Sequence, residues 1–143
     1  MKSFCSDKMK DEVILLSRFL LVLLFLIFGW GKFTDYSGTI AYMQQVGAPM
    51  PTVATIVAII MELFASLAII VGIFTRPLAI LLAIYTLGTA LIGHHYWTMT
   101  GMAHFEGEIN FYKNISIIGG CFLLYVTGAG KYSLDARLGL AAE

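Results

Sequence analysis

The chain has 143 residues, of which 59% are apolar and only 13% are charged, against about 25% charged residues in ordinary soluble domains. So few charges cannot cover a water-facing surface, which predicts an integral membrane protein surrounded by the lipid bilayer. The formal net charge is zero, which excludes the electrostatic attraction on which nucleic-acid-binding proteins depend.

Four apolar segments approach the length that a membrane span requires. A bilayer core about 30 Å thick needs about 20 mostly apolar residues per helix. We expect the spans at residues 13–33, 53–73, 77–96 and 111–127. Glycine and proline cluster between them, as at residues 47–51. The expected fold is therefore an all-α bundle of four transmembrane helices.

The lysines and arginines predict how this bundle is oriented, because they accumulate on the cytoplasmic side of a membrane protein. Seven of the nine fall on one side of the expected bundle and two on the other, the seven being Lys2, Lys8, Lys10, Arg18, Arg76, Lys131 and Arg137. We therefore expect a transmembrane domain at residues 13–127. Its flanking tails, residues 1–12 and 128–143, are both predicted to be cytoplasmic.

Small residues repeat along the second and third spans and predict close helix contacts. They recur at the spacing of left-handed helix packing in two series. One is Ala54, Ala58, Ala65, Ala68 and Gly72, with the larger Met61 at the intervening position, and the other is Ala79, Ala83, Thr86, Ala90 and Gly93. Spans two and three are expected to be close neighbours.

Glu62 lies in the middle of the second span, where a carboxyl group is expensive and by default suggests function. It borders the series of small residues, so we expect it inside the bundle. Tyr85 and Thr86 lie at a similar depth on the third span. Two interpretations stay open. Glu62 either ties two helices together by a hydrogen bond to Thr86 or Tyr85, or belongs to a proton path or ligand site.

Arg18 and Lys32 lie toward opposite ends of the first span. Long cationic side chains reach along a helix to the lipid headgroups, so we expect both residues to act as membrane anchors. For Lys32 there is an alternative, because Gly29 and Gly31 permit a close approach of backbone. The cation then holds an anionic headgroup or ligand.

The segment His94-His95-Tyr96-Trp97 ends the third span. Tyrosine and tryptophan are enriched at membrane interfaces, so an aromatic belt is the first interpretation. Successive helical residues point about 100° apart, so His94 and His95 do not easily share a metal, and no metal site is predicted. The alternative is a quinone-headgroup site with a histidine as hydrogen-bond partner.

Residues 99–109 are expected to form a polar loop on the same side as this segment. It carries His104, Glu106 and Glu108, and Lys113 and Asn114 follow where the fourth span begins. One interpretation is a solvated loop with interfacial caps. The other is a shallow pocket that Lys113 and Asn114 line together with Lys32 and the two histidines.

These motifs, taken in chain order, resemble the DoxX family of small four-helix inner-membrane proteins of Gram-negative bacteria. The resemblance covers residues 18–138 and rests on Gly29-x-x-Lys32-Phe33, Gly47-Ala48-Pro49, Met61-Glu62, Gly72-x-Phe74-Thr75-Arg76-Pro77, His94-His95-Tyr96-Trp97 and Asn110-Phe111-x-Lys113-Asn114. It implies a location in the bacterial inner membrane. Six positions match ones that recur in the family, namely Lys32, Glu62, Arg76, His95, Lys113 and Asn114. No family-wide catalytic role attaches to them.

The family takes its name from a small subunit associated with a quinone-reducing thiosulfate oxidoreductase, and another member is linked to a membrane complex that handles oxidative and thiol stress. The resemblance therefore implies a redox-linked accessory subunit that binds quinone or a redox protein partner, rather than a stand-alone enzyme. No other cofactor is evident. Cys5 and Cys121 form no C-x-x-C pair, so direct dithiol chemistry is not expected. The alternative is a non-catalytic assembly module or small-molecule carrier, for which a homo-oligomer supplies additional walls.

Overall fold

The computed structural model describes residues 7–140, and this part of the chain consists of helices joined by turns. The helices are α1 (Asp7–Thr34), α2 (Tyr36–Gln45), α3 (Pro51–Ile59), the π-helical segment η1 (Ile60–Ala65), α4 (Ser66–Val71), α5 (Thr75–Gly93), the short 3-10 turn η2 (Tyr96–Thr98), α6 (Gly101–Thr127) and α7 (Leu134–Arg137). Residues 1–6 and 141–143 of the two expected tails, including Lys2 and Cys5, lie outside the described residues.

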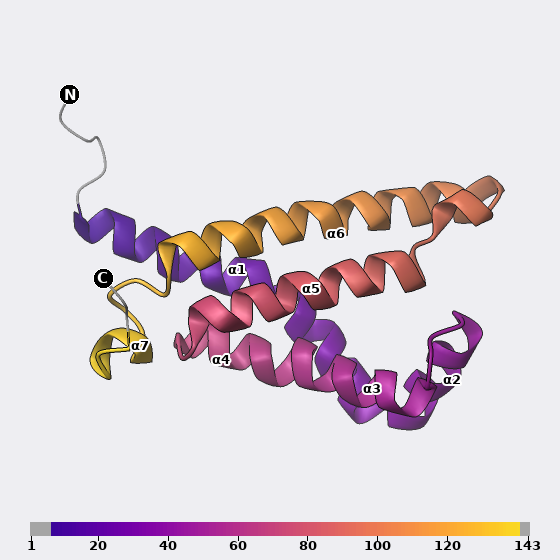
Figure 1. Cartoon of the computed structure of the whole chain (residues 1–143), viewed down its shortest axis with the longest axis horizontal. Helices are drawn as coiled ribbons and strands as arrows, with labels where there is room; N and C mark the ends of the chain where they lie inside the picture. The colour runs from indigo at the N-terminus through magenta and orange to yellow at the C-terminus, as the bar shows by residue number, and fades with distance from the viewer. Residues whose placement is uncertain (1–6, 141–143) are drawn as a thin grey trace.

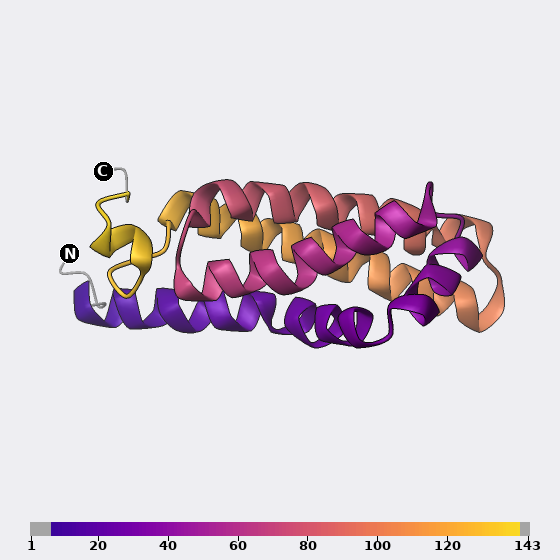
Figure 2. The same ribbon diagram turned by 90° about the horizontal axis from the view of Figure 1, so that it is seen from below.

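Four stretches of the described chain are long and apolar enough to cross a membrane: Met9–Thr34, Pro51–Val71, Thr75–Thr98 and Gly101–Thr127. The prediction of an all-helical protein with four membrane-spanning helices is confirmed. The helices run alternately away and back, α1 outward, α3 to α4 back, α5 outward and α6 back (Figure 1). Helix α2 follows α1 at one end of the bundle, which we call the α2 end. The short helix α7 lies at the opposite end, the α7 end (Figure 2).

The fourth helix begins earlier than expected. Residues 101–109 were expected to belong to a loop, but α6 starts at Gly101 and continues to Thr127. The segment after Gly101 contains good helix formers such as Met102, Ala103 and Glu106, and propensity of this kind extends a helix beyond its apolar part. His104 and Glu108 lie one helical turn apart, with Nε2 and Oε2 3.9 Å from each other.

A second helix, α2, occupies the connection between the first two spans. Its N-cap is Asp35, whose Oδ1 accepts a hydrogen bond from the backbone N–H of Gly38 at 3.1 Å. A carboxylate at this position satisfies one of the free N–H groups of the first turn. This helix lies at the α2 end of the bundle (Figure 2) and packs against α3.

The core lies where α1, α4, α5 and α6 meet. It contains Val22, Phe25, Ile69, Ala79, Leu82, Ala83, Cys121 and Leu124, all buried. The small residues of the third span do face other helices, because Ala79, Ala83, Thr86 and Ala90 are buried. Helix α5 touches α4 and η1, as expected for spans two and three, but its most extensive interface is with α6.

The C-terminal segment closes the α7 end by capping α5. Asp135 accepts two backbone hydrogen bonds, from Phe74 N to Oδ1 at 2.8 Å and from Thr75 N to Oδ2 at 3.0 Å. These N–H groups open α5 and have no partner within the helix. The backbone N–H of Asp135 in turn donates to the carbonyl of Gly72 at 2.8 Å. The carboxylate therefore fastens α7 to the turn between α4 and α5.

Arg18 does not anchor the protein to headgroups, and that prediction is wrong. Its side chain is 1% exposed and donates to the carbonyls of Ala129 at 2.6 Å, Tyr132 at 2.8 Å and Ile70 at 3.1 Å. Carbonyls at helix ends and in the loops beyond them lack intrahelical partners, and a guanidinium has enough donors to serve several of them at once.

Candidate functional site

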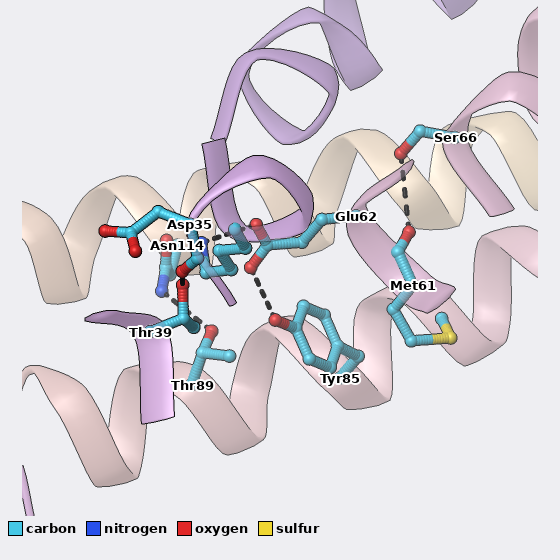
Figure 3. Close-up of polar contacts among 9 residues, drawn as sticks. Asp35, Thr39, Met61, Glu62, Ser66, Tyr85, Thr89 and Asn114 are labelled. Carbon is cyan, nitrogen blue, oxygen red and sulfur yellow. Dashed lines mark hydrogen bonds and ion pairs between the residues drawn. The ribbon is translucent and has the colours of Figure 1, made fainter. Parts of the chain in front are cut away.

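Glu62 is at the centre of a buried polar cluster. Its Oε2 lies 2.6 Å from Nζ of Lys32, and its Oε1 accepts a hydrogen bond from the hydroxyl of Tyr85 at 2.5 Å. The three side chains come from η1, α1 and α5, and Figure 3 shows the bond between Glu62 and Tyr85. Glu62 is 7% exposed. We call Lys32, Glu62 and Tyr85 the Glu62 cluster.

The position of Glu62 depends on the π-helical segment η1, Ile60–Ala65. A π-turn inserts one extra residue into a helix and is found frequently at functional sites. Ordinary α-helix precedes and follows this segment, in α3 and α4. The π-helical geometry is therefore confined to the six residues that include Glu62.

Gly29 explains how Lys32 reaches this carboxylate. A Cβ on Gly29 would lie 2.8 Å from both the carbonyl carbon of Glu62 and the backbone nitrogen of Leu63. Real Cβ atoms essentially never approach so closely, so only glycine lets α1 lie against η1 here. Residues three apart lie on the same face of a helix, and Lys32 therefore stands over Glu62. This contact accounts for the Gly29-x-x-Lys32 motif.

The expected roles of Lys32 and Thr86 need correction. Lys32 was expected to be an interfacial anchor, but its side chain is only 20% exposed and pairs with Glu62, because α1 approaches η1 too closely for it to point away. Thr86 was one of two expected partners of Glu62, but its hydroxyl donates to the carbonyl of Leu82 at 2.7 Å. Threonines in helices commonly make this bond. Tyr85, the other expected partner, makes the contact.

A cavity of about 850 Å³ opens beside the Glu62 cluster. Its walls come from α1, α2, α3, η1, α5 and α6, and it extends toward the α2 end. The polar lining consists of the Glu62 cluster and Asp35, Thr39, Tyr42, Thr89, His94, Asn110, Lys113 and Asn114. The apolar lining includes Leu24, Phe25, Ile27, Phe28, Met43, Val46, Ala48, Ala54, Ala58 and Ile92. A mostly apolar wall with a few polar groups is the usual form of a small-molecule site.

Nitrogen donors are prominent in this lining. The amide of Asn114 is buried and donates from Nδ2 to Oγ1 of Thr89 at 3.4 Å, a contact drawn in Figure 3. Lys113 donates to Oδ1 of Asn110 at 2.7 Å. His94 lines the same cavity from the end of α5. The structure thus brings together Lys32, Glu62, Tyr85, His94, Lys113 and Asn114, which the sequence placed on four different spans.

His95 lies apart from this cavity. Its Nδ1 is 2.8 Å from the carbonyl of Ile92, and its ring makes an edge contact with Trp97, the centroids 6.4 Å apart. Tyr96 and Trp97 continue this aromatic contact to Phe111 of α6, at 5.6 and 5.7 Å. The segment expected to form an aromatic belt therefore packs η2 against α6.

No group of three or more histidine, cysteine, aspartate or glutamate side chains that could hold a metal ion occurs within residues 7–140. The acidic groups near the cavity already have partners, Asp35 at the start of α2 and Glu62 in its cluster. The arrangement offers hydrogen bonds and a buried charge pair.

Sequence reasoning missed the part of the cavity that α2 contributes. Asp35 and Thr39 line it, and the hydroxyl of Thr39 donates to the carbonyl of Asp35 at 2.8 Å. It also missed Thr89 and Asn110. Aspartate is a favoured N-cap residue, so Asp35 is the one sequence signal for the start of α2.

Comparison with known proteins gives consistent matches along the chain. The DoxX family model matches residues 13–95. Inner membrane protein YphA of Escherichia coli K12 is 53% identical over 128 residues, which cover 90% of this chain and 91% of that protein. Inner membrane protein YqjF of the same organism is 39% identical over 134 residues, covering 92% and 95%.

A more distant match is ER-derived vesicles protein ERV29 of Saccharomyces cerevisiae, which is 25% identical over 134 residues. These residues cover 92% of this chain but 36% of the yeast protein. No solved structure gives a significant match. The family model includes the whole Glu62 cluster and His94, whereas Asn110, Lys113 and Asn114 lie beyond its matched residues.

Proposed function

The chain belongs to the DoxX family of membrane proteins, as its motifs indicated, and from this premise we propose that it is a redox-linked accessory protein that binds a quinone in the cavity beside the Glu62 cluster. The observation that carries the proposal is a buried carboxylate that contacts both an ammonium and a phenol at the wall of a cavity of about 850 Å³. Buried ionisable groups within a membrane are expensive and functional by default.

The chemistry of the lining suits a quinone headgroup. Its two carbonyl oxygens accept hydrogen bonds, and the lining offers N–H donors on Lys113, Asn114 and His94. The apolar walls include the rings of Phe25 and Phe28, which suit a flat six-membered ring. In this proposal the residues of this chain bind and orient the ring. The electrons for its reduction come from a redox protein partner.

The Glu62 cluster supplies a proton-bearing group to the same cavity. Reduction of a quinone to a quinol takes up two electrons and two protons. The hydrogen bond from Tyr85 to Glu62 and the ammonium of Lys32 hold exchangeable protons at the cavity wall. A carboxyl and a phenol are both competent proton donors and acceptors. Their place in the proposal is to hold a proton near the ring.

The proposed setting is the bacterial inner membrane, with both ends of the chain in the cytoplasm. The two Escherichia coli relatives are named inner membrane proteins. Arg18, Arg76, Lys131 and Arg137 belong to the α7 end, the side that the positive-inside rule assigns to the cytoplasm. The cavity then extends toward the periplasmic side. Alkaline phosphatase and green fluorescent protein fused to the C-terminus test this orientation, and phosphatase activity contradicts it.

The experiment that tests the quinone proposal compares wild type with Glu62→Gln. Both are purified from native membranes, and their bound small molecules and proteins are identified by mass spectrometry. Both are then titrated with a decyl-tailed benzoquinone. We expect quinone to co-purify with wild type and to be depleted in the variant. A wild-type protein that carries no quinone and binds none in titration contradicts the proposal.

One observation favours the second candidate, a non-catalytic assembly module or small-molecule carrier. Both carboxylate oxygens of Glu62 are occupied by the chain's own donors, which is also what a purely structural tie between helices requires. The same mass-spectrometric experiment separates the candidates. A protein partner retained by both wild type and Glu62→Gln, without quinone, supports the assembly module.

A further inference from the structure

The cavity has a side boundary formed by α1 and α6. These two helices run in opposite directions (Figure 2) and touch at Leu21 and Gly120. A Cβ on Gly120 would lie 2.8 Å from Cδ1 of Leu21. At this level the two helices are as close as their side chains allow. Leu21, together with Ile117 and Ile118 of α6, packs against the core.

Toward the α2 end the same two helices line the cavity instead. Seven residues farther along each antiparallel helix, about 10 Å at 1.5 Å per residue, Phe28 of α1 and Lys113 of α6 lie at the same level. Both line the cavity. Ile27, the neighbour of Phe28 on α1, lines it too, and the two residues are 61% and 56% exposed. Helix α6 therefore leaves this part of α1 uncovered.

The residues at this boundary suit contact with both lipid and a polar headgroup. Ile27 and Phe28 are apolar and lie within the membrane span Met9–Thr34. The Phe28 ring also lies beneath the ammonium of Lys32, 5.6 Å from Nζ to the centroid, a cation–π distance. Gly31 lines the cavity, and a Cβ there would meet no atom within 4 Å. We call Ile27, Phe28, Gly31 and Lys113 the side opening.

From this geometry we propose that the cavity takes an amphiphile from the bilayer itself, with its hydrocarbon chain passing through the side opening. The polar head lies beside the Glu62 cluster, and the chain runs past Ile27 and Phe28 into the half of the bilayer at the α2 end. This inference rests on the proposed function of the cavity as a ligand site and adds the class of ligand and its route. A ligand with a long apolar tail has no need to leave the membrane.

The test uses a fatty acid with a diazirine next to its carboxyl group, incorporated into phosphatidylcholine nanodiscs that contain the protein. After photolysis the labelled residues are identified by peptide mass spectrometry. Phe25 and Ala58 are the reporters, because both line the cavity yet are only 5% and 1% exposed. Lipid-facing Leu123, 69% exposed, reports labelling from the bulk bilayer. We expect all three to be labelled in wild type.

Two glycine variants locate the route. Gly31→Leu places a side chain in the side opening, and Gly119→Leu is its control on the lipid-exposed surface of α6. Neither position has an atom within 4 Å of an added Cβ, so both variants are expected to fold. Labelling of Phe25 and Ala58 is expected to fall about tenfold in Gly31→Leu, as for a binding loss of about 1.4 kcal/mol. It is expected to stay unchanged in Gly119→Leu.

Two results overturn the inference: wild-type label on Leu123 without label on Phe25 and Ala58, or equal labelling of these reporters in both variants. The quinone titration is read separately. Interior labelling without quinone binding refutes the quinone headgroup and leaves the side opening supported. Quinone binding without interior labelling supports the quinone headgroup and refutes the side opening.

Discussion

Gly29 of α1 and Glu62 of η1 are in backbone contact, with no room for a Cβ between them. An added Cβ would lie 2.8 Å from the carbonyl carbon of Glu62 and 2.9 Å from its Cβ. This close contact between α1 and η1 places the Lys32 ammonium within ion-pair distance of the Glu62 carboxylate. The charge pair therefore depends on a residue that carries no functional group.

Gly29→Ala is expected to lower stability, because the helices must separate to accommodate the methyl group. Overpacking of this kind costs about 1–3 kcal/mol. The control is Gly31→Ala on the same helix, where an added Cβ meets nothing within 4 Å. Alanine has the higher helix propensity, so that variant is expected to match or exceed wild type. Thermal unfolding in detergent micelles measures both. Equal melting temperatures for the two variants contradict the close-contact argument.

The charge pair of Lys32 and Glu62 gives a second prediction. Removing one member leaves the other buried without its partner, which costs about 3–5 kcal/mol in fully buried pairs. Because Lys32 is partly exposed, we expect a smaller loss for Glu62→Gln and for Lys32→Met. The double variant is expected to be less destabilised than the sum of the single ones. A double-mutant cycle of unfolding free energies measures this coupling, and strict additivity shows that the pair contributes none.

The sequence predicted the helices of this fold more completely than it predicted their partners. Apolar length alone located four spans, because each must cross the same bilayer thickness. The midplane position of Glu62 and the depth of Tyr85 followed from counting residues along two helices. Lys32 was assigned to the interface, because its neighbouring glycines permit a close approach without showing which helix approaches or that η1 widens there. Such contacts depend on how two helices are rotated against each other.

Residues at the chain's C-terminal end were equally hidden from sequence analysis. Arg18 is followed by apolar residues and has the pattern of a snorkelling anchor. Its partners Ala129 and Tyr132 lie more than a hundred positions away and offer only backbone carbonyls. A backbone acceptor leaves no signature in residue type, so this contact is visible only once the helices are placed.

Arg18 is expected to control the order of the C-terminal segment. Arg18→Met keeps much of the side-chain volume but removes the donors to Ala129, Tyr132 and Ile70. Leaving buried carbonyls unsatisfied costs about 1–3 kcal/mol each. Hydrogen exchange of residues 128–140 is expected to accelerate, with Lys10→Met, an exposed cation on the same helix, as control. Unchanged protection in Arg18→Met contradicts a clasping role.

Two aspartates that cap helices are expected to respond differently to the same substitution. Asp135 uses both carboxylate oxygens, one for Phe74 N and the other for Thr75 N. Asparagine has only one carbonyl oxygen, and its NH₂ group faces the second N–H without accepting from it. Phe74 is a non-glycine residue with φ of 50°, a conformation that needs support from its surroundings. Asp135→Asn is therefore expected to lower the unfolding free energy by about 1–2 kcal/mol.

Asp35→Asn is the matched comparison, because Asp35 caps α2 through a single bond from Gly38 N to Oδ1. Asparagine is as good an N-cap as aspartate, so this change is expected to be nearly neutral. Chemical unfolding of both variants in the same detergent gives the two differences directly. If Asp35→Asn is as destabilising as Asp135→Asn, the loss arises from removing an acidic charge at a helix N-terminus. If only Asp135→Asn is destabilised, the second hydrogen bond is what holds α7 against the start of α5.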